Sequence, residues 1–395
     1  LVYGTGLVNA ALPPERRGVA MGVKLCSIGL ASCASPVVGC LLVQYWHWRG
    51  LFVIVGAAAA VLAGLTTLYV PNQKIPKGGK FDWFSFLAVG MGCVCMLMVL
   101  IYGEADGWTA PGVLAWMYGG FCSFALAFIS CMTHRTPLLD VRVLGNWRFL
   151  CGLLASLCNI FCICWVRTVQ FMRNVMNYEP VGIAYVFMVL VAGFCGGAAL
   201  VLPLMQKGRL ALRVGMMAGL LALGASAFFL SRLDAGCSWL DVAWPLGLFG
   251  IGYAFCLNTA TPLALRGVEG RSAAASSRTL NTVRYIFISL YVSSVSTVLA
   301  HMKTGFRFSM AEQVRDDSPG TAHTLDMWQR HFAETGGTAR EIHASVDAVL
   351  QKAVALQSQV FSVDTFYLCT VIVGAAGVLF ALFCLKSGQE RKAAS

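Results

Sequence analysis

The sequence has little charge. Asp, Glu, Lys and Arg make up 12% of its 395 residues, whereas soluble domains contain about 25%. Hydrophobic residues account for 58%, which excludes a disordered chain, because disordered chains are poor in apolar residues. A soluble fold of this size would also lack the charged side chains that its surface needs. The composition therefore predicts an integral membrane protein.

Motifs for cofactor, metal or nucleophilic chemistry are missing as well. The sequence contains no phosphate-binding G-x-x-x-x-G-K-[ST] motif, which argues against ATP-driven transport by this chain alone. The spacing of His301, His323, His331 and His343 fits no standard metal-ligand motif. Almost all of the 16 cysteines fall inside apolar runs, where a cysteine is typically a small buried residue. We therefore expect no cofactor, no metal site and no enzymatic activity.

Long apolar runs are what the sequence does have. A helical span needs about 20 predominantly apolar residues, and ten runs meet this criterion. They cover residues 19–45, 50–70, 84–102, 112–132, 149–172, 182–205, 210–231, 240–265, 279–301 and 361–385. The apolar stretch 1–12 is too short to cross and begins with Leu1. We interpret it as the tail of an eleventh helix in an N-terminally truncated chain; a signal peptide is the alternative, although no basic segment precedes it.

The connections between these runs alternate in charge. One set, together with the C-terminal tail, carries 17 Lys or Arg residues, and the opposite short connections carry Arg49, Arg173 and Arg232. Because Lys and Arg are enriched in cytoplasmic loops, the C-terminus is expected in the cytoplasm of a multi-pass cell-membrane protein. Lipid contacts of these basic loops explain the net charge of +11, so no nucleic-acid partner is expected. The long connection 302–360 would then be external, with an amphipathic helix over 338–359.

Several short motifs follow one another at a characteristic spacing. The turn 13–18 reads P-P-E-R-R-G, residues 46–52 read W-H-W-R-G-L-F, and residues 171–180 read F-M-R-N-V-M-N-Y-E-P. Residues 281–284 read N-T-V-R, and 364–366 read D-T-F. In order and spacing this set resembles the major facilitator superfamily, specifically its fourteen-span multidrug efflux type (EmrB/QacA-like drug:proton antiporters). The resemblance covers essentially the whole chain.

This resemblance implies an all-α helical bundle without roughly the first three to four spans of the family. Residues 1–70 would form the end of the N-terminal bundle, which holds spans 4–6. Residues 71–148 would form an inserted helix pair, spans 7–8, with a cytoplasmic linker, and residues 149–395 the C-terminal bundle of spans 9–14. It also implies secondary active export of drugs or other amphipathic small molecules, with protons as the coupling ion.

The family's antiporter motif corresponds here to Ser35, Pro36, Gly39 and Cys40. A proline inside a helix removes a backbone hydrogen bond and kinks the helix, and small residues let a neighbouring helix approach closely. Such a seam would let one bundle rock against the other; simple helix packing is the alternative. Ser35 and Cys40 replace two family glycines, so the seal is expected to differ.

The helix that begins near residue 279 departs further from the family. Phe287 and Tyr291 stand where glycines are expected, so either the helix is displaced or the two rings project into a central cavity. They could equally face lipid or pack as core. Asn281 and Arg284 lie near the inner end of this span, where they could brace a cytoplasmic gate or simply add to the positive inner charge.

Other polar residues inside the spans are candidates for substrate contact. Arg167 lies about five residues from the outer end of its span; it could reach the interface or line a cavity and favour anionic or polar substrate groups. Asn159 and Asn258 lie in mid-span, where interhelical hydrogen bonding is the usual role. No carboxylate falls in mid-membrane. Asp364, at the outer end of the last span, is the nearest substitute for a proton carrier, unless it caps that helix.

The sequence thus predicts a transporter for a small-molecule substrate. The alternative is a transport-inactive relative that acts as a sensor or assembly partner, which the altered glycine motifs would favour.

Overall fold

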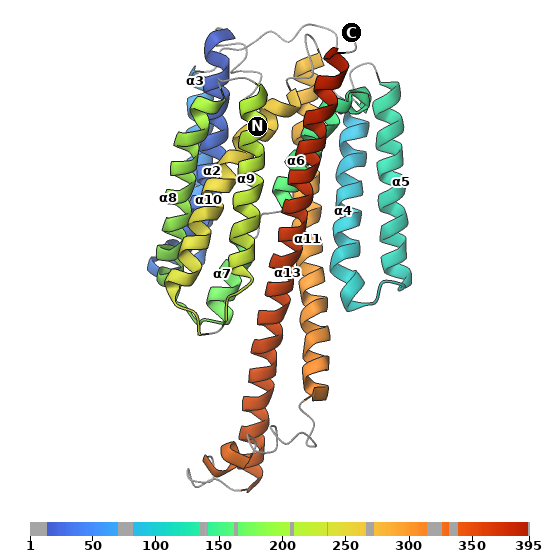
Figure 1. Ribbon diagram of the computed structural model, residues 1–395. Helices are drawn as coiled ribbons and strands as arrows, with labels where there is room; N and C mark the ends of the chain where they lie inside the picture. Colours follow the sequence, from blue (N-terminus) through green and yellow to red (C-terminus); the bar gives the residue numbers. More distant parts are fainter. Residues whose placement is uncertain are drawn as a thin grey trace.

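The computed structural model describes residues 14–69, 82–134, 139, 141–161, 165–205, 209–234, 236–265, 272–313, 326–331 and 339–393. Helices make up nearly all of this described part, which contains no strand. The chain is therefore all-α, as its apolar runs predict, and its helices lie side by side in a bundle (Figure 1).

The helices follow one another along the chain. They are α2 (Pro14–Tyr45), α3 (Trp48–Tyr69), α4 (Trp83–Ala105), α5 (Pro111–Thr133), the 3₁₀ helix η1 (Val141–Gly145), α6 (Trp147–Phe161), α7 (Trp165–Asn174), α8 (Pro180–Leu204), α9 (Arg209–Leu230), α10 (Trp239–Leu265), α11 (Ser272–Gln313) and α13 (Ala339–Ala393). Within the described ranges, nine helices are long and apolar enough to cross a membrane.

The run 149–172, expected as one span, contains α6 and α7; residues 162–164 between these two helices lie outside the described part. The apolar stretch 1–12 also lies outside the described residues.

Local sequence explains several helix ends. Pro111 and Pro180 stand in the first turns of α5 and α8, where a missing backbone N–H has no cost. Asp82 caps α4 by accepting a hydrogen bond from the Ser85 backbone N–H at 3.0 Å. Asn177, between α7 and α8, has a left-handed backbone with φ of 55°, a conformation that asparagine tolerates better than most residues.

The most closely packed part of the bundle is α8 against α10 and α10 against α9. Glycines make this approach possible: a Cβ atom at Gly193 of α8 would overlap the Gly247 carbonyl of α10, and one at Gly250 of α10 would overlap the Leu190 carbonyl. Large side chains fill the space around these contacts, and Phe187 and Phe249 are fully buried there. The main hydrophobic core therefore lies among α8, α9 and α10.

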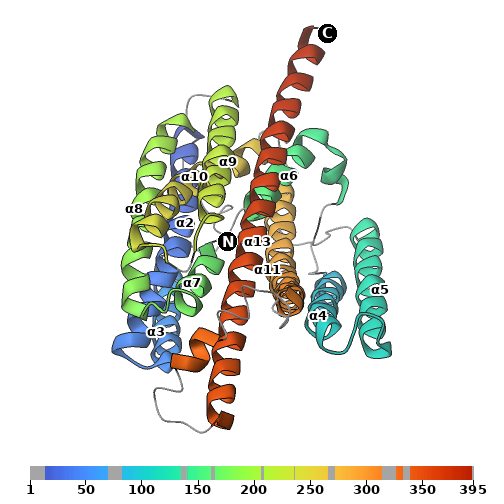
Figure 2. The same ribbon diagram turned by 60° about the horizontal axis from the view of Figure 1, so that its bottom comes forward.

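The remaining helices pack around this core. Helix α2 lies against α8 and α10, α13 lies against α9, and α6 lies against α10 and α13. Helices α4 and α5 pack mainly on each other and reach the rest of the bundle through α11; Figure 2 shows this pair set to one side. Helix α3 has no buried residue, so its apolar side chains face outward all round.

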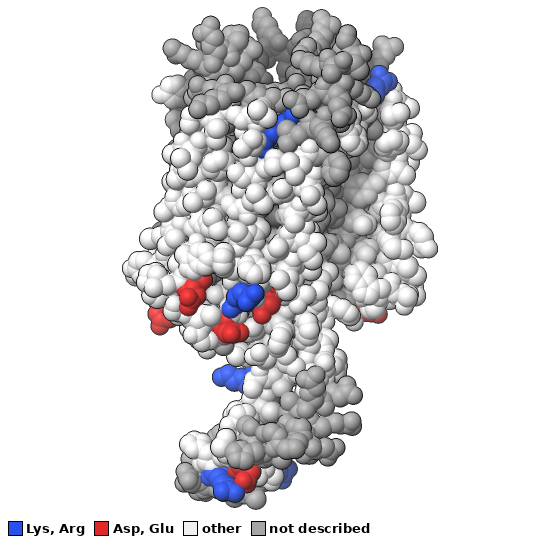
Figure 3. Space-filling view, viewed as in Figure 1, with Lys and Arg blue, Asp and Glu red and all other residues white. Residues whose placement is uncertain are grey.

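The outer surface of the bundle suits lipid. Large apolar side chains are exposed on most helices; Phe52 is 67% exposed and Leu68 is 79% exposed. Among the described residues on the face seen in Figure 3, no charged side chain lies in the middle of the bundle, and charged residues gather toward its ends. An apolar band with charged ends is what a bilayer requires, and the chain is a multi-pass membrane protein.

Helices α11 and α13 are longer than a span requires. With 42 and 55 residues, they measure roughly 60 and 80 Å at 1.5 Å per residue, and both extend past the other helices at the end opposite the C-terminus (Figure 1). Residues 302–313 and 339–360, expected in the long connection, are thus helical. The helix predicted over 338–359 is confirmed as the first part of α13.

Candidate functional site

The antiporter-type motif lies on α2, partly turned away from the packed side of that helix. The buried stripe of α2 is made by Leu25, Gly29, Cys33 and Val37. A Cβ atom at Gly29 would collide with the Phe194 ring of α8. Close helix approach therefore occurs on this stripe.

The motif residues themselves are less closely packed. Ser35 is exposed and donates a hydrogen bond to the Ser32 carbonyl within α2 at 2.9 Å. A Cβ atom at Gly39 would meet nothing within 4 Å. Pro36 lies inside α2, and Cys40 is partly buried against the main core. In this conformation Gly39 does not serve close packing against a described helix, and the gating role of the motif stays a prediction.

The two mid-span asparagines are buried between helices. Asn258 on α10 is fully buried; it accepts a hydrogen bond from the Cys26 thiol of α2 at 3.5 Å and donates one to the Ala254 carbonyl at 2.8 Å. Asn159 on α6 is 2% exposed, and its amide oxygen has no hydrogen-bond partner in the described part. Asn258 thus links α10 to α2, the usual role of a membrane amide.

Arg284 on α11 reaches across to α10. Its guanidinium donates a hydrogen bond to the Thr261 hydroxyl at 3.1 Å and interacts electrostatically with Tyr253. Thr261 and Tyr253 are 3% and 7% exposed, so the arginine points into the protein and not toward lipid. The Ser32 hydroxyl of α2 donates to the Ile28 carbonyl of its own helix at 3.0 Å. Arg284 therefore links α11 to α10.

Asn281 is one turn before Arg284 on α11. Its amide donates to the Ser277 carbonyl of the same helix at 2.9 Å. The two residues predicted to brace a gate thus have different partners: Arg284 bonds a neighbouring helix, and Asn281 bonds its own.

Phe287 and Tyr291 stack on each other along α11. Their ring centroids are 6.4 Å apart and their planes differ by 5°. Residues at i, i+3 and i+7 of a helix share one face, so this stack lies on the face of α11 that carries Arg284. Both rings are partly buried. We call Arg284, Phe287 and Tyr291 the α11 face.

Arg167 on α7 lies at the far end of the α11 face. Its guanidinium donates to the Ser296 hydroxyl of α11 at 2.7 Å and to the Gln170 side chain at 2.8 Å. It also interacts electrostatically with Tyr291 and with Tyr367 of α13. Arg167 therefore lies among α7, α11 and α13.

The structure brings four of the predicted residues into one region: Arg167, Arg284, Phe287 and Tyr291. It does not place Asn159, Asn258 or the α2 motif on the α11 face. Sequence reasoning missed the partners Thr261, Tyr253 and Ser296. Hydroxyl side chains are common in membrane helices, and no spacing marks which of them face an arginine of another helix.

Asp364 has a different setting from the one expected. If it capped the last span, it would stand at a helix start, but it lies well inside the continuous helix α13, so a capping role is wrong. It is partly buried, one carboxylate oxygen is buried without a hydrogen-bond partner in the described part, and it interacts electrostatically with Asp234. Carboxylates inside a span are costly and are functional candidates.

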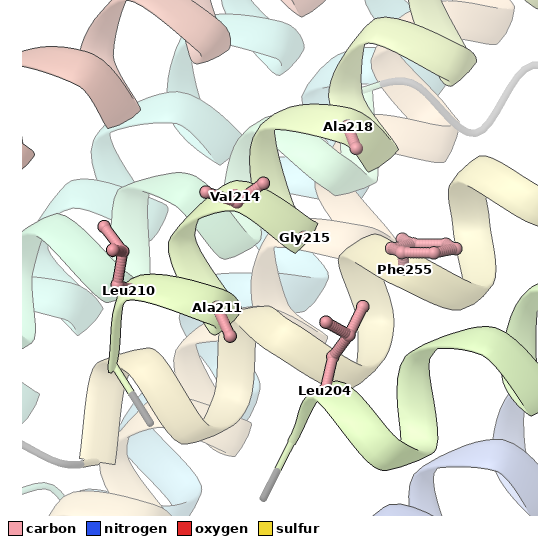
Figure 4. Close-up of a pocket in the computed structure, with 7 residues that line it drawn as sticks. All are labelled: Leu204, Leu210, Ala211, Val214, Gly215, Ala218 and Phe255. Carbon is pink, nitrogen blue, oxygen red and sulfur yellow. The ribbon is translucent and has the colours of Figure 1, made fainter. Parts of the chain in front are cut away.

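A pocket of about 350 Å³ lies elsewhere, among α8, α9 and α10. Figure 4 shows the side chains around it, which come from Leu204, Leu210, Ala211, Val214, Gly215, Ala218 and Phe255. All of these residues are apolar, whereas a specific small-molecule site normally includes a few polar groups that fix the ligand. We therefore place the candidate site at the α11 face and not in this pocket.

Comparison with known proteins finds one family and several relatives that are similar to this chain. The family described as Major Facilitator Superfamily matches residues 1–291. Multidrug resistance protein Stp of Mycobacterium tuberculosis (strain CDC 1551 / Oshkosh) is 26% identical over 305 residues, which are 76% of this chain and 56% of that protein. A probable actinorhodin transporter of Streptomyces coelicolor is 22% identical over 345 residues, 81% of this chain and 57% of that protein. The chain thus spans somewhat more than half the length of these relatives.

One solved structure is similar to the chain at a low score. It is a bacterial homologue of the human lysosomal transporter Spinster in an inward-facing, unoccupied conformation. The match covers 97% of this chain and 74% of that one, at 14% sequence identity and a TM-score of 0.48.

Proposed function

Because the chain belongs to the major facilitator superfamily, we propose that it is a secondary active transporter that exports drugs or other amphipathic small molecules by alternating access. The observation that carries this proposal is the α11 face. Arg284 makes a partly buried contact with α10, and an aromatic stack and Arg167 follow farther along α11. Charged groups within membrane spans mark substrate or ion pathways.

The proposed path runs along α11. Arg284 lies toward the end where α10 ends and α11 begins, and Arg167 bonds Ser296, about 18 Å farther along α11 at 1.5 Å per residue. This separation suits a path through most of the roughly 30 Å hydrocarbon core. In this proposal the contact of Arg284 with Thr261 closes the cytoplasmic side and must break when that side opens.

The fourteen-span drug:proton antiporter type is the finer part of the proposal. The names of the relatives, which include a multidrug resistance protein, support the drug export but say nothing of this chain's own substrate. The separate packing of α4 with α5 supports the division into an N-terminal bundle portion 1–70, an inserted pair within 71–148 and a C-terminal bundle 149–395. We further propose a cytoplasmic C-terminus in the cell membrane, based on the 17 basic residues of the loops and tail on that side.

For proton coupling we propose Asp364 as the carboxylate that binds and releases the proton. One of its carboxylate oxygens is buried and makes no hydrogen bond within the described residues, and carboxylates inside membrane spans mark proton relays. Opening toward water would release the proton.

The test uses everted membrane vesicles from a host that lacks its own efflux pumps, with the protein expressed from its own gene. We expect a proton gradient to drive uptake of several unrelated drugs and a protonophore to abolish it. Asp364→Asn should abolish gradient-driven uptake and retain exchange of labelled for unlabelled drug. A folded protein that moves no drug would contradict the proposal and favour the sensor or assembly role.

A further inference from the structure

The two arginines of the candidate site have neutral partners. Arg284 donates to the Thr261 hydroxyl, and Arg167 donates to the Ser296 hydroxyl and the Gln170 amide oxygen. Among the described residues, these hydrogen-bond partners of the two guanidinium groups are all neutral. Neither guanidinium has a described carboxylate within salt-bridge distance.

This arrangement is costly unless something compensates the charge. A guanidinium in a low-polarity interior loses solvation, and hydroxyl partners recover only part of it. Structural arginines in such places are normally paired with a carboxylate. Each group has five N–H donors; the described contacts use one at Arg284 and two at Arg167. Donors remain for a further acceptor at both positions.

The aromatic stack lies between the two charges. Phe287 and Tyr291 follow Arg284 by one and two turns on the same face of α11, and Tyr291 lies within electrostatic reach of Arg167. Stacked rings offer a flat apolar surface to another ring. A guanidinium fork at either end offers paired donors to a carboxylate or a similar oxyanion.

From this geometry we infer that the protein's preferred substrates are amphipathic aromatic anions, with a ring system on the Phe287–Tyr291 stack and an acidic oxygen group on Arg167 or Arg284. This inference rests on the proposed transport function and specifies the substrate class at the same site. A lipophilic cation would meet two like charges along the α11 face, and that repulsion is not screened in a low-dielectric interior.

The experiment compares two dyes that share one ring system. Fluorescein is an anionic xanthene and rhodamine 6G is a cationic one, so the two dyes share a ring system and carry charges of opposite sign. Uptake of each is measured in energised everted vesicles. We expect fluorescein uptake at least tenfold faster than rhodamine 6G uptake. Arg167→Gln and Arg284→Gln should each lower fluorescein uptake at least tenfold, and the Lys variants should retain part of it.

A matched control variant is Arg232→Gln. Arg232 lies over the Phe228 ring near the outer end of α9, away from the α11 face, so its removal should leave fluorescein uptake within twofold of the wild type. The amount of each variant in the membrane and its gel-filtration profile in detergent show whether it folds. If a variant misfolds, a competition experiment on the wild-type protein tests the same inference. In that experiment 2-naphthoate should inhibit fluorescein uptake, and neutral 2-naphthamide should not.

The outcomes separate this inference from the transport proposal. Faster uptake of rhodamine 6G, unchanged by either Gln variant, would overturn the anion preference and leave the transporter intact. Equal inhibition by naphthoate and naphthamide would overturn it too. If the protein transports neither dye and the purified protein does not bind naphthoate, the anion preference is also refuted. The uptake of several unrelated drugs, described above, then tests the transport function separately.

Discussion

The hydroxyl of Thr168 on α7 and the phenol of Tyr367 on α13 lie 2.8 Å apart and share a hydrogen bond, although both side chains are fully buried. This bond attaches the short helix α7 to α13 one residue from Arg167. It therefore helps to position the guanidinium that meets Ser296 and Tyr291.

Tyr367→Phe should weaken this attachment. The change leaves the Thr168 hydroxyl buried without its partner, at a cost of about 1–3 kcal/mol, and it should slow transport by loosening Arg167. Thermal unfolding in detergent and vesicle uptake provide the measurements. The double variant Thr168→Val with Tyr367→Phe should lose less stability than the sum of the single changes; strictly additive losses would show that the bond contributes nothing.

Close packing of α8 on α10 predicts a contrast between two glycines of one helix. Gly193→Ala would push a methyl group into the Gly247 carbonyl, whereas Gly196 has open space where the methyl would lie. We expect Gly193→Ala to cost about 1–3 kcal/mol or to prevent folding. Gly196→Ala should be neutral or stabilise by up to about 1 kcal/mol, because alanine favours helix. Folded yield in the membrane measures both, and equal yields would contradict the packing described for α8 and α10.

Gly39 on α2 allows a test of the gating motif that folding does not confound. Because the space beside Gly39 is open in this conformation, Gly39→Ala should leave the yield and thermal stability unchanged. If the motif forms a closed seam in another transport state, the added methyl group should lower the transport rate severalfold with little effect on substrate binding. Gly90→Ala on α4, which also has open space, is the control; identical rates for the two variants would argue against gating.

Asn159 on α6 distinguishes a packing role from substrate contact. Its amide oxygen is buried and has no described hydrogen-bond partner, and it is not on the α11 face. Asn159→Leu should therefore keep or raise stability, because it removes a buried acceptor that nothing satisfies, and it should leave transport kinetics unchanged. A higher KM with unchanged protein yield would instead make Asn159 a substrate contact.

The sequence predicted Arg167 and Arg284 as candidate site residues but not their partners. Arg167 and Arg284 attract attention because a cation inside an apolar run is rare. Thr261 and Ser296 look like any other hydroxyl residues, and each is far from its arginine in the chain. Which hydroxyl an arginine reaches depends on how each helix is rotated about its axis and on which helices are neighbours. A linear pattern of nearly uniform hydropathy contains little information on either.

Asp364 shows the same limit at a helix end. Asp364 stands at the start of the last apolar run, and capping of that span was one of its two interpretations. Helix α13 instead continues without a break from Ala339, because amphipathic and apolar segments can form one helix when neither contains a breaker. Hydropathy marks where a helix can enter the membrane and not where its hydrogen bonding begins.

The sequence by itself determined that this chain is an all-helical membrane protein and where most of its spans lie, because a bilayer forces every apolar segment of sufficient length to satisfy its own backbone hydrogen bonds. Only the tertiary structure decided that α8, α9 and α10 form the close-packed core and that Arg167 of α7 bonds Ser296 of α11, beyond the face that carries Arg284. These features depend on side chains that meet across helices, and such contacts exist only after the helices have packed.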